Sequence, residues 1–242
     1  MKMFAKNSLS VLWRVVFANF VCIFLILAVS TICTALTTKD IGYQAYGVKE
    51  GSTENELLYT YYEKDGEDTL KADYESKGYT VSTVSIRSDM SKTARNVFLI
   101  IAQIVCISST AFFIYPIVWS FGNKDNNRVH FGRISEDKLR GFKIGLASML
   151  PFFLFFIAFV VFALGAYESF DVILYKFINC YAFGFLDFII GDAVYVGELK
   201  IWQFALIFVT LFIVPIIAHF AYLLGYKDIS IIEKLVYKKK DK

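Results

Sequence analysis

The sequence predicts an all-α polytopic membrane protein with four transmembrane helices. A small α/β extracytoplasmic loop is expected between helices 1 and 2, and an interfacial or re-entrant segment between helices 3 and 4. Hydrophobic residues make up 57% of the 242 residues, whereas a soluble domain is about 45–50% apolar. Residues 97–120 and 144–166 contain no charged side chain. Each run exceeds the roughly 20 apolar residues that cross a hydrocarbon core.

The charges of the connecting segments predict the orientation of these helices. Residues 122–143 carry six Lys or Arg side chains against three carboxylates. Residues 37–92 instead hold eleven carboxylates and seven basic side chains, and residues 168–200 hold five and two. Because short loops rich in Lys and Arg stay on the cytoplasmic side, both termini and residues 122–143 are expected there. The predicted location is the cytoplasmic membrane, and the richness in Lys, Asn, Ile, Tyr and Phe suggests a bacterial source.

These patterns divide the chain into nine segments. In order, they are a cytoplasmic N-terminus (1–14), helix 1 (15–36), an extracytoplasmic α/β loop (37–92), helix 2 (95–121), a basic cytoplasmic loop (122–143), helix 3 (144–166), an extracytoplasmic interfacial segment (167–200), helix 4 (201–224) and a Lys-rich cytoplasmic tail (225–242). The first apolar run exceeds the 7–15 residues of a typical signal-peptide core, which favours a retained helix over a cleaved leader.

The extracytoplasmic loop contains the signals for two strands and a helix. Residues 57–62 (LLYTYY) and 79–86 (YTVSTVSI) are rich in aromatic or β-branched residues and predict strands. Asp68 and Gly78 suit the two ends of a short helix at 69–77. The connection is long enough for a parallel strand–helix–strand unit. This loop either captures a ligand outside the cell or is a connector with local structure, and the connector is the favoured interpretation.

Residues 170–191 are almost apolar enough to form a fifth span, but they carry Lys176 and Asp187. Each charge costs about 2.5–3.5 kcal/mol at the centre of a bilayer, and a fifth span would place the Lys-rich tail outside. The segment is therefore predicted to be either re-entrant, with Lys176, Asp187 and Asp192 in a polar vestibule, or an amphipathic interfacial helix. The interfacial alternative is slightly favoured.

Polar residues inside the spans predict helix packing or a pathway. Asn19 in helix 1 is expected to face another helix. Gln103 and Ser109 form a polar strip on helix 2 that, together with Lys176 and Asp187, is the candidate pathway for a small molecule or ion. Pro116, Pro151 and Pro215 are expected to bend or kink helices 2, 3 and 4.

The basic loop is predicted to be a turn at 123–127 and an extended segment at 128–133, with Ser135 capping the next helix. Its likeliest use is contact with a partner. The residues expected to make that contact are Arg128, His130, Arg133 and Arg140. Beyond them, Gly141, Gly145 and Ser148 form a small-residue face on which another helix can pack closely.

Several functions are excluded or disfavoured. Cys22 and Cys106 fall inside spans, and no CxxC or Cys/His cluster indicates a metal; a Cys33–Cys180 disulfide is conceivable without being demanded. The sequence contains no HExxH, GxSxG, P-loop or dinucleotide fingerprint. We therefore expect no catalytic residue, cofactor or metal, and no nucleic-acid partner, since a net charge of +3 is mild and segregated by side.

Three functional hypotheses remain. The first is a non-enzymatic scaffold or accessory subunit that binds the lipid bilayer and another membrane protein or itself. The second is a small-molecule or ion permease. The third and least favoured is an enzyme acting on a lipid-linked substrate, for which only His130, Asp187 and Asp192 offer catalytic groups.

Overall fold

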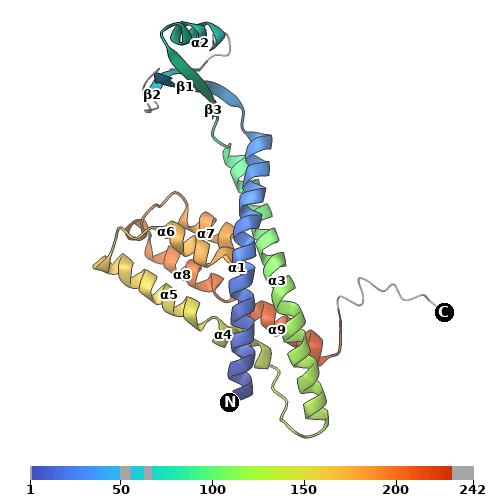
Figure 1. Ribbon diagram of the computed structural model, residues 1–242. Coiled ribbons are helices and arrows are strands. Elements are labelled where there is room, and N and C mark those ends of the chain that lie inside the picture. The colour runs from blue at the N-terminus through green and yellow to red at the C-terminus, as the bar shows by residue number, and fades with distance from the viewer. Residues whose placement is uncertain (1, 50–55, 63–66, 231–242) are drawn as a thin grey trace, which may run out of the picture. The chain divides into compact units, whose positions relative to one another are not determined.

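The computed structural model describes residues 2–49, 56–62 and 67–230, which are mostly helical (Figure 1). The chain forms two compact units. The helical unit comprises Met1–Val29 and Val97–Lys242, and the sheet unit comprises Ser30–Asn96. The chain passes between them inside α1 (Lys2–Thr37) and again inside α3 (Lys92–His130).

The sheet unit is a three-stranded antiparallel sheet with one helix. Its strands are β1 (Asp40–Lys49), β2 (Glu56–Tyr61) and β3 (Tyr79–Arg87), in the spatial order β2-β1-β3. The helix α2 (Glu67–Ser76) joins β2 to β3 and places the ring of Tyr74 on Tyr59, with centroids 5.5 Å apart. Gly78 follows α2 with a φ of +83°, as predicted for a residue that ends a helix. A hydrogen bond to Asp73 raises the pKa of Lys77 above its ordinary value.

The strands β2 and β3 and the helix between them were predicted, but their pairing was not. They do not form an adjacent parallel pair, because β1 lies between them and pairs antiparallel with both. β1 has the sequence DIGYQAYGVK, whose glycines and charged ends weaken its β propensity. A Cβ at Gly42 would collide with the backbone carbonyl oxygen of Tyr61 on β2. The glycine that hides this strand in the sequence is therefore what allows the neighbouring strand to approach.

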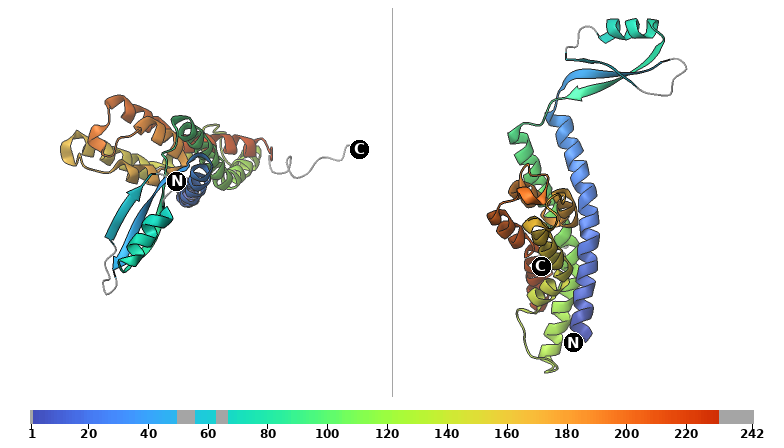
Figure 2. Two further views of the ribbon diagram at one scale, coloured as in Figure 1. Left: turned by 90° about the horizontal axis from the view of Figure 1, so that it is seen from above. Right: turned by 90° about the vertical axis from the view of Figure 1, so that its left-hand side faces the viewer.

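Three helices of the described chain are long and apolar enough to cross a membrane: Met3–Thr37, Lys92–His130 and Ile201–Tyr226. Two further pairs of helices are bent, by 51° at 140–165 and by 97° at 172–190, so three to five segments could cross a membrane by length and composition. α1 and α3 run side by side (Figures 1 and 2), with the rings of Phe17 and Phe113 5.1 Å apart. At 1.5 Å per residue they are about 54 and 58 Å long.

The predicted basic loop is shorter than the sequence indicated, because α3 continues to His130. The expected turn at 123–127 and extended segment at 128–133 are therefore wrong up to that residue. The extra turns are held by chain beyond α9: Asn123 donates to Asp228 at 2.7 Å, and Trp119 donates to the Ile229 carbonyl at 2.8 Å. The next helix, α4 (Arg140–Ser148), begins five residues after Ser135, so the predicted cap at Ser135 is also wrong.

Two of the three predicted proline bends, at Pro151 and Pro215, coincide with breaks, whereas α3 continues through Pro116. α4 ends before Met149, and α5 (Leu150–Val161) starts with Pro151 in its first turn. α8 (Ile201–Thr210) and α9 (Ile213–Tyr226) are separated at residues 211–212, four residues before Pro215. A proline cannot donate to the carbonyl four residues earlier and clashes with it, which explains the interruption at Leu211.

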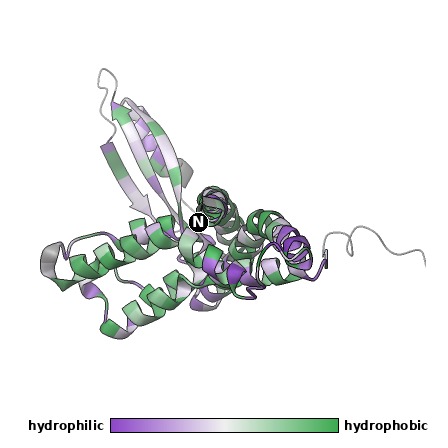
Figure 3. Cartoon of the chain, turned by 90° about the horizontal axis from the view of Figure 1, so that it is seen from below, coloured by the Kyte–Doolittle hydropathy of each residue, from purple (hydrophilic) through white to green (hydrophobic). Residues whose placement is uncertain are grey.

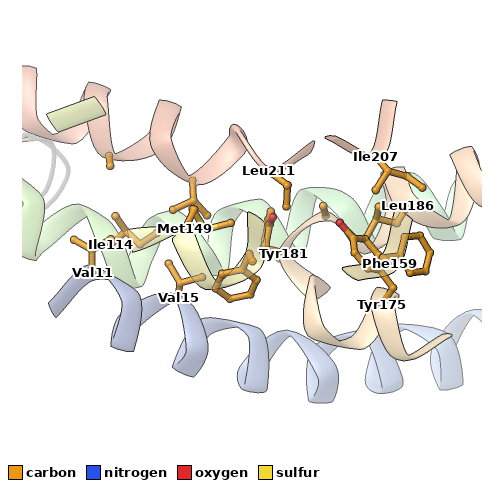
Figure 4. Packing of buried hydrophobic residues seen from close by; sticks show 14 of the residues in the cluster. Val11, Val15, Ile114, Met149, Phe159, Tyr175, Tyr181, Leu186, Ile207 and Leu211 are labelled. Atoms are coloured by element: carbon orange, nitrogen blue, oxygen red, sulfur yellow. The ribbon is translucent and has the colours of Figure 1, made fainter. Parts of the chain in front are cut away.

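The core of the helical unit is built around aromatic residues of the bent pairs. Between α5 and α8 the chain forms the π-helical turn η1 (Phe162–Ala166), α6 (Val172–Ile178), η2 (Cys180–Ala182), α7 (Phe183–Ile190) and η3 (Val196–Glu198). Tyr175 stacks between Phe155 and Phe159, at 5.6 and 4.3 Å. Figure 4 shows Tyr175 grouped with Phe159, Leu186 and Ile207. The helices are mostly coloured as hydrophobic in Figure 3, which fits the exposed apolar side chains along α1 and α3.

Candidate functional site

Two clusters of polar side chains are buried in the helical unit, and they are the strongest candidates for functional residues. The first lies around the bend between α6 and α7, which with η2 form a helical hairpin (172–190). The tip of this hairpin is buried: Asn179, Cys180, Tyr181 and Ala182 are each 0% exposed. A bend of 97° leaves backbone groups at the tip without helical partners, so other groups must bind them.

Asn19 of α1 binds one side of this tip. Its side-chain nitrogen donates to the carbonyl oxygen of Ile178 at 2.8 Å, and its side-chain oxygen accepts from the backbone nitrogen of Tyr181 at 3.0 Å. Asn19 is 7% exposed. An amide carries both a donor and an acceptor, which is what an interrupted helix requires. The expectation that Asn19 faces another segment is met by the hairpin.

Gln103 of α3 binds the other side in the same manner. Its nitrogen donates to the Tyr181 carbonyl at 3.1 Å, and its oxygen accepts from the backbone nitrogen of Phe185 at 3.0 Å. Gly184 permits the close approach, because a Cβ there would lie 2.8 Å from the Cβ of Gln103 and closer still to the Leu99 carbonyl oxygen. We call Asn19 and Gln103 together the hairpin clamp.

The two arms of the hairpin are joined by an ion pair. The Lys176 amine donates to the Asp187 carboxylate at 2.8 Å, and the two side chains are only 11% and 15% exposed. Lys176 lies on α6 and Asp187 on α7. Pairing offsets much of the cost of removing each charge from water. The ion pair therefore keeps α6 and α7 close together on either side of the bend.

Three of the four residues predicted to form a polar pathway therefore belong to the hairpin and its clamp. Gln103 binds the tip and Lys176 pairs with Asp187 across the two arms, whereas Ser109 lies further along α3 and is half-buried outside this set. Asp192 lies just beyond α7 and is exposed. The separation of 82 residues between Gln103 and Phe185 hid their contact in the sequence, since only the fold joins α3 to α7.

Three of the four cysteines gather next to the clamp, and none forms a disulfide. All four are free thiols, so the conceivable bond between Cys33 and Cys180 is absent. Cys22, Cys106 and Cys180 are buried in one apolar cluster with Ile26, where Cys22 donates to the Cys106 carbonyl at 3.7 Å. Within residues 2–49, 56–62 and 67–230, no group of three or more His, Cys, Asp or Glu side chains is arranged to hold a metal ion.

The second polar cluster surrounds Asp125 near the C-terminal end of α3. The Asp125 side chain is 3% exposed and accepts from Arg140 at 3.1 Å, from Arg128 at 3.5 Å and from the hydroxyl of Tyr222 at 3.2 Å. These three partners come from α4, α3 and α9. We call the four residues the Asp125 cluster. Its centre could not be predicted from the sequence, because the Asn and Asp residues at 123–127 indicate a turn.

The Asp125 cluster divides the residues predicted to bind a partner. Arg128 and Arg140 are turned partly inward, with side chains 37% and 17% exposed. His130 and Arg133 remain exposed, and the guanidinium of Arg133 lies 5.8 Å from the ring centre of Phe131. Only His130 and Arg133 of the four predicted residues are thus presented mainly to the outside.

The predicted small-residue face lies against α9. A Cβ on Gly145 would lie 2.7 Å from the Cα of Pro215, and Gly141 lies against Tyr222. The Ser148 hydroxyl donates to the Gly145 carbonyl at 2.6 Å, so it caps its own helix. A second close crossing was not predicted: Gly122 of α3 and Gly225 of α9 meet backbone to backbone, although they are 103 residues apart.

Comparison of this chain with family models, with curated proteins and with solved structures finds no match. The functional argument therefore depends on the geometry of the two polar clusters.

Proposed function

We propose that this chain is a non-enzymatic multi-pass membrane protein that acts as a scaffold or accessory subunit of a membrane complex in the cytoplasmic membrane. One observation supports this above others. The polar side chains embedded in the apolar helices bind the hairpin and each other: both ends of the Gln103 amide contact backbone groups of the hairpin, and Lys176 pairs with Asp187. Polar groups that are already bonded within the protein stabilise its fold and are not available to bind a substrate.

The same contacts support a re-entrant hairpin. Backbone groups without partners cost several kcal/mol each in hydrocarbon, so irregular backbone persists there only against protein or a wet cavity. Asn19 and Gln103 supply protein partners at the tip. α6 and α7 are 7 and 8 residues long, about 10 and 12 Å. Neither arm can cross a hydrocarbon core of about 30 Å.

The proposed topology has four spans, formed by α1, α3, the α4–α5 pair and the α8–α9 pair. The hairpin enters and leaves on the extracytoplasmic side. An even number of spans keeps both termini on the cytoplasmic side, in accord with the Lys and Arg residues of segments 122–143 and 225–242. The exposed His130 and Arg133 then face the cytoplasm, where a partner can reach them.

The experiment is a pull-down of the tagged full-length chain from its native membrane in mild detergent, followed by sizing and mass spectrometry. The account expects a stoichiometric second protein. An Arg133→Glu variant should reduce its recovery at least about threefold, whereas Lys227→Glu, an equal charge change outside the loop, should not. A monomer or homo-oligomer that retains only lipid would contradict the accessory role.

A permease is the second candidate, and one observation favours it. Two of the helical pairs are bent by more than 40°, at Met149 and at the hairpin tip, and discontinuous helices often frame binding sites in transporters. The test is flux of ions and small solutes into proteoliposomes that contain the purified chain. Flux above that of empty liposomes, lost on Ser109→Val and retained on Ser108→Val, would replace the scaffold proposal.

A further inference from the structure

A cavity of about 220 Å³ lies between the first turns of α1 and the C-terminal part of α3. It is separate from the hairpin and borders the Asp125 cluster through Asp125 and Arg128. The residues that line it are Met3, Lys6, Asn7, Phe121, Lys124, Asp125 and Arg128.

The lining has an excess of positive charge. It contains three cations, Lys6, Lys124 and Arg128, and one carboxylate, that of Asp125. The carboxylate is already bound by Arg140, whose nitrogen lies 3.1 Å away, and by the hydroxyl of Tyr222. In the part of the chain that the structure describes, neither Lys6 nor Lys124 enters an ion pair. Two amines therefore remain to bind an anion.

Arg128 is the third cation of the cavity, and contacts with Asp125 and Met3 fix its position. One of its terminal nitrogens is 3.5 Å from Asp125 and 2.8 Å from the sulfur of Met3. A guanidinium has five N–H donors, so donors remain for a ligand after these two contacts. Arginine forks match phosphate oxygens, and lysine amines add point charge. Asn7 offers a neutral donor on the same wall.

The place of the cavity along the helices also indicates its ligand. The apolar run of α1 begins at Val15, eight residues after Asn7, and that of α3 ends at Phe121. In the proposed topology the cavity therefore lies just outside the hydrocarbon, at the level of phospholipid headgroups. Met3 and Phe121 supply an apolar wall beside the charged one.

We propose that this cavity binds a phosphate group, carried by an anionic lipid headgroup or by a soluble phosphate ion. The shared chemistry is a tetrahedral anion held by Lys6, Lys124 and Arg128, with Asp125 orienting Arg128. The lipid source rests on the proposed membrane location, whereas phosphate binding by the purified chain does not. Failure of the scaffold proposal would leave this site untouched.

The test compares two doubly substituted full-length chains that lose the same charge. Lys6→Gln/Lys124→Gln removes the two free amines of the cavity, and Arg133→Gln/Lys138→Gln removes two exposed cations of the neighbouring loop. Each chain is placed in nanodiscs of phosphatidylcholine with a minor share of phosphatidylglycerol, and native mass spectrometry counts the retained phosphatidylglycerol. The wild-type chain and the loop variant should retain it equally. The cavity variant should lose at least about tenfold in apparent affinity, given roughly 1 kcal/mol per basic residue.

A second arm identifies the source of the phosphate. Thermal unfolding of the three chains is measured in detergent without phospholipid, with inorganic phosphate and with chloride at equal ionic strength. Stabilisation by phosphate in the wild-type chain and loop variant but not in the cavity variant identifies a soluble ion. Phosphatidylglycerol retention without this stabilisation identifies the lipid. If neither ligand distinguishes the cavity variant from the loop variant, the proposal is wrong. Equal unfolding temperatures in chloride show that all three chains are folded.

Discussion

The hairpin clamp and the Asp125 cluster fasten helices with different chemistry. The clamp uses two neutral amides, each bound to two backbone groups of a buried bend. The Asp125 cluster uses a carboxylate, two guanidinium groups and a hydroxyl. The clamp lies within apolar runs of α1 and α3, whereas the cluster lies where those runs end. Charge is expensive in hydrocarbon and cheap at its edge, so each chemistry suits the depth that the proposed topology assigns to it.

The helices α1 and α3 each supply one amide side chain, Asn19 and Gln103, that binds unpaired backbone groups of the hairpin. A neutral amide is the least costly side chain that can satisfy an N–H and a C=O together. The ion pair Lys176–Asp187 is an intermediate case, since it is charged but lies inside the hairpin at 11% and 15% exposure. The loss of stability on substitution should therefore be largest in the hairpin clamp, smaller in the Lys176–Asp187 pair and smallest in the Asp125 cluster.

The largest effect is expected from Gln103→Leu. It leaves the Tyr181 carbonyl and the Phe185 amide without their partner in a buried place. At about 1–3 kcal/mol for each unsatisfied group, the loss of stability should be about 2–6 kcal/mol in denaturant titration of the micellar protein. Ser108→Leu, on the exposed side of the same helix, is the control and should change stability by less than about 0.5 kcal/mol. A loss below about 1 kcal/mol at Gln103 would show that the clamp does not hold the hairpin.

The next effect is expected from Lys176→Met, which removes the amine bound to the Asp187 carboxylate. Breaking a buried ion pair costs about 3–5 kcal/mol, and partial exposure places this one near the lower end. The double variant Lys176→Met/Asp187→Leu should regain most of that loss, because no charge is then left in the hairpin. Equal instability of the single and double variants would mean that the pair does not act as a unit.

Asp125→Asn tests the charged cluster, with an expected loss of about 2 kcal/mol. Hydrogen bonds to charged groups contribute about 1.5–3 kcal/mol, and Arg140 can turn its partly exposed head toward water. Unlike the clamp, the cluster is charged and should weaken slightly with salt, because the Arg128 side chain is 37% exposed, although the buried pair of Asp125 and Arg140 is screened much less. Unfolding at low and high ionic strength measures this. The same salt response in Gln103→Leu and in Asp125→Asn would remove the distinction between the two clusters.

The smallest effect is expected from Tyr222→Phe, which deletes the hydroxyl that donates to Asp125 at 3.2 Å and leaves the two arginines bound. A hydrogen bond to a charged group contributes about 1.5–3 kcal/mol, and the length of this one places the loss at about 1.5 kcal/mol. Tyr226→Phe on the same helix removes a hydroxyl outside the cluster and is the control. A larger loss than that of Asp125→Asn would place the centre of the cluster at Tyr222 instead.

The sequence predicted the features that depend on neighbouring residues. Apolar runs, the break before Pro151 and the small-residue face at Gly141 and Gly145 each follow from a local pattern, and the structure contains the break and the close packing on α9. β2 and β3 were predicted from their β-branched and aromatic residues. β1 was not, since its glycines serve the approach of a neighbour that the pattern does not reveal.

The two polar clusters depend on contacts between distant residues, which is why sequence reasoning found only parts of them. Asn19 and Gln103 were recognised as polar positions in apolar helices, but their shared partner, the tip at Tyr181, lies 162 and 78 residues away. Asp125 was assigned to a turn because Asn and Asp favour turns. Contacts with Arg140 of α4 and Tyr222 of α9 instead stabilise the continued helix α3 and bury the Asp125 carboxylate.

The most direct test of the account asks on which side of the membrane the two ends of the hairpin lie. Single cysteines at Ser169 and Val194, both exposed, and at Lys138 as an inner reference, are introduced into a Cys33→Ser chain and labelled with an impermeant maleimide in intact cells. The account predicts that Ser169→Cys and Val194→Cys are both labelled from outside, and Lys138→Cys only after lysis. Labelling of one hairpin end from outside and the other only after lysis would make residues 172–190 a fifth span and would contradict the clamped hairpin.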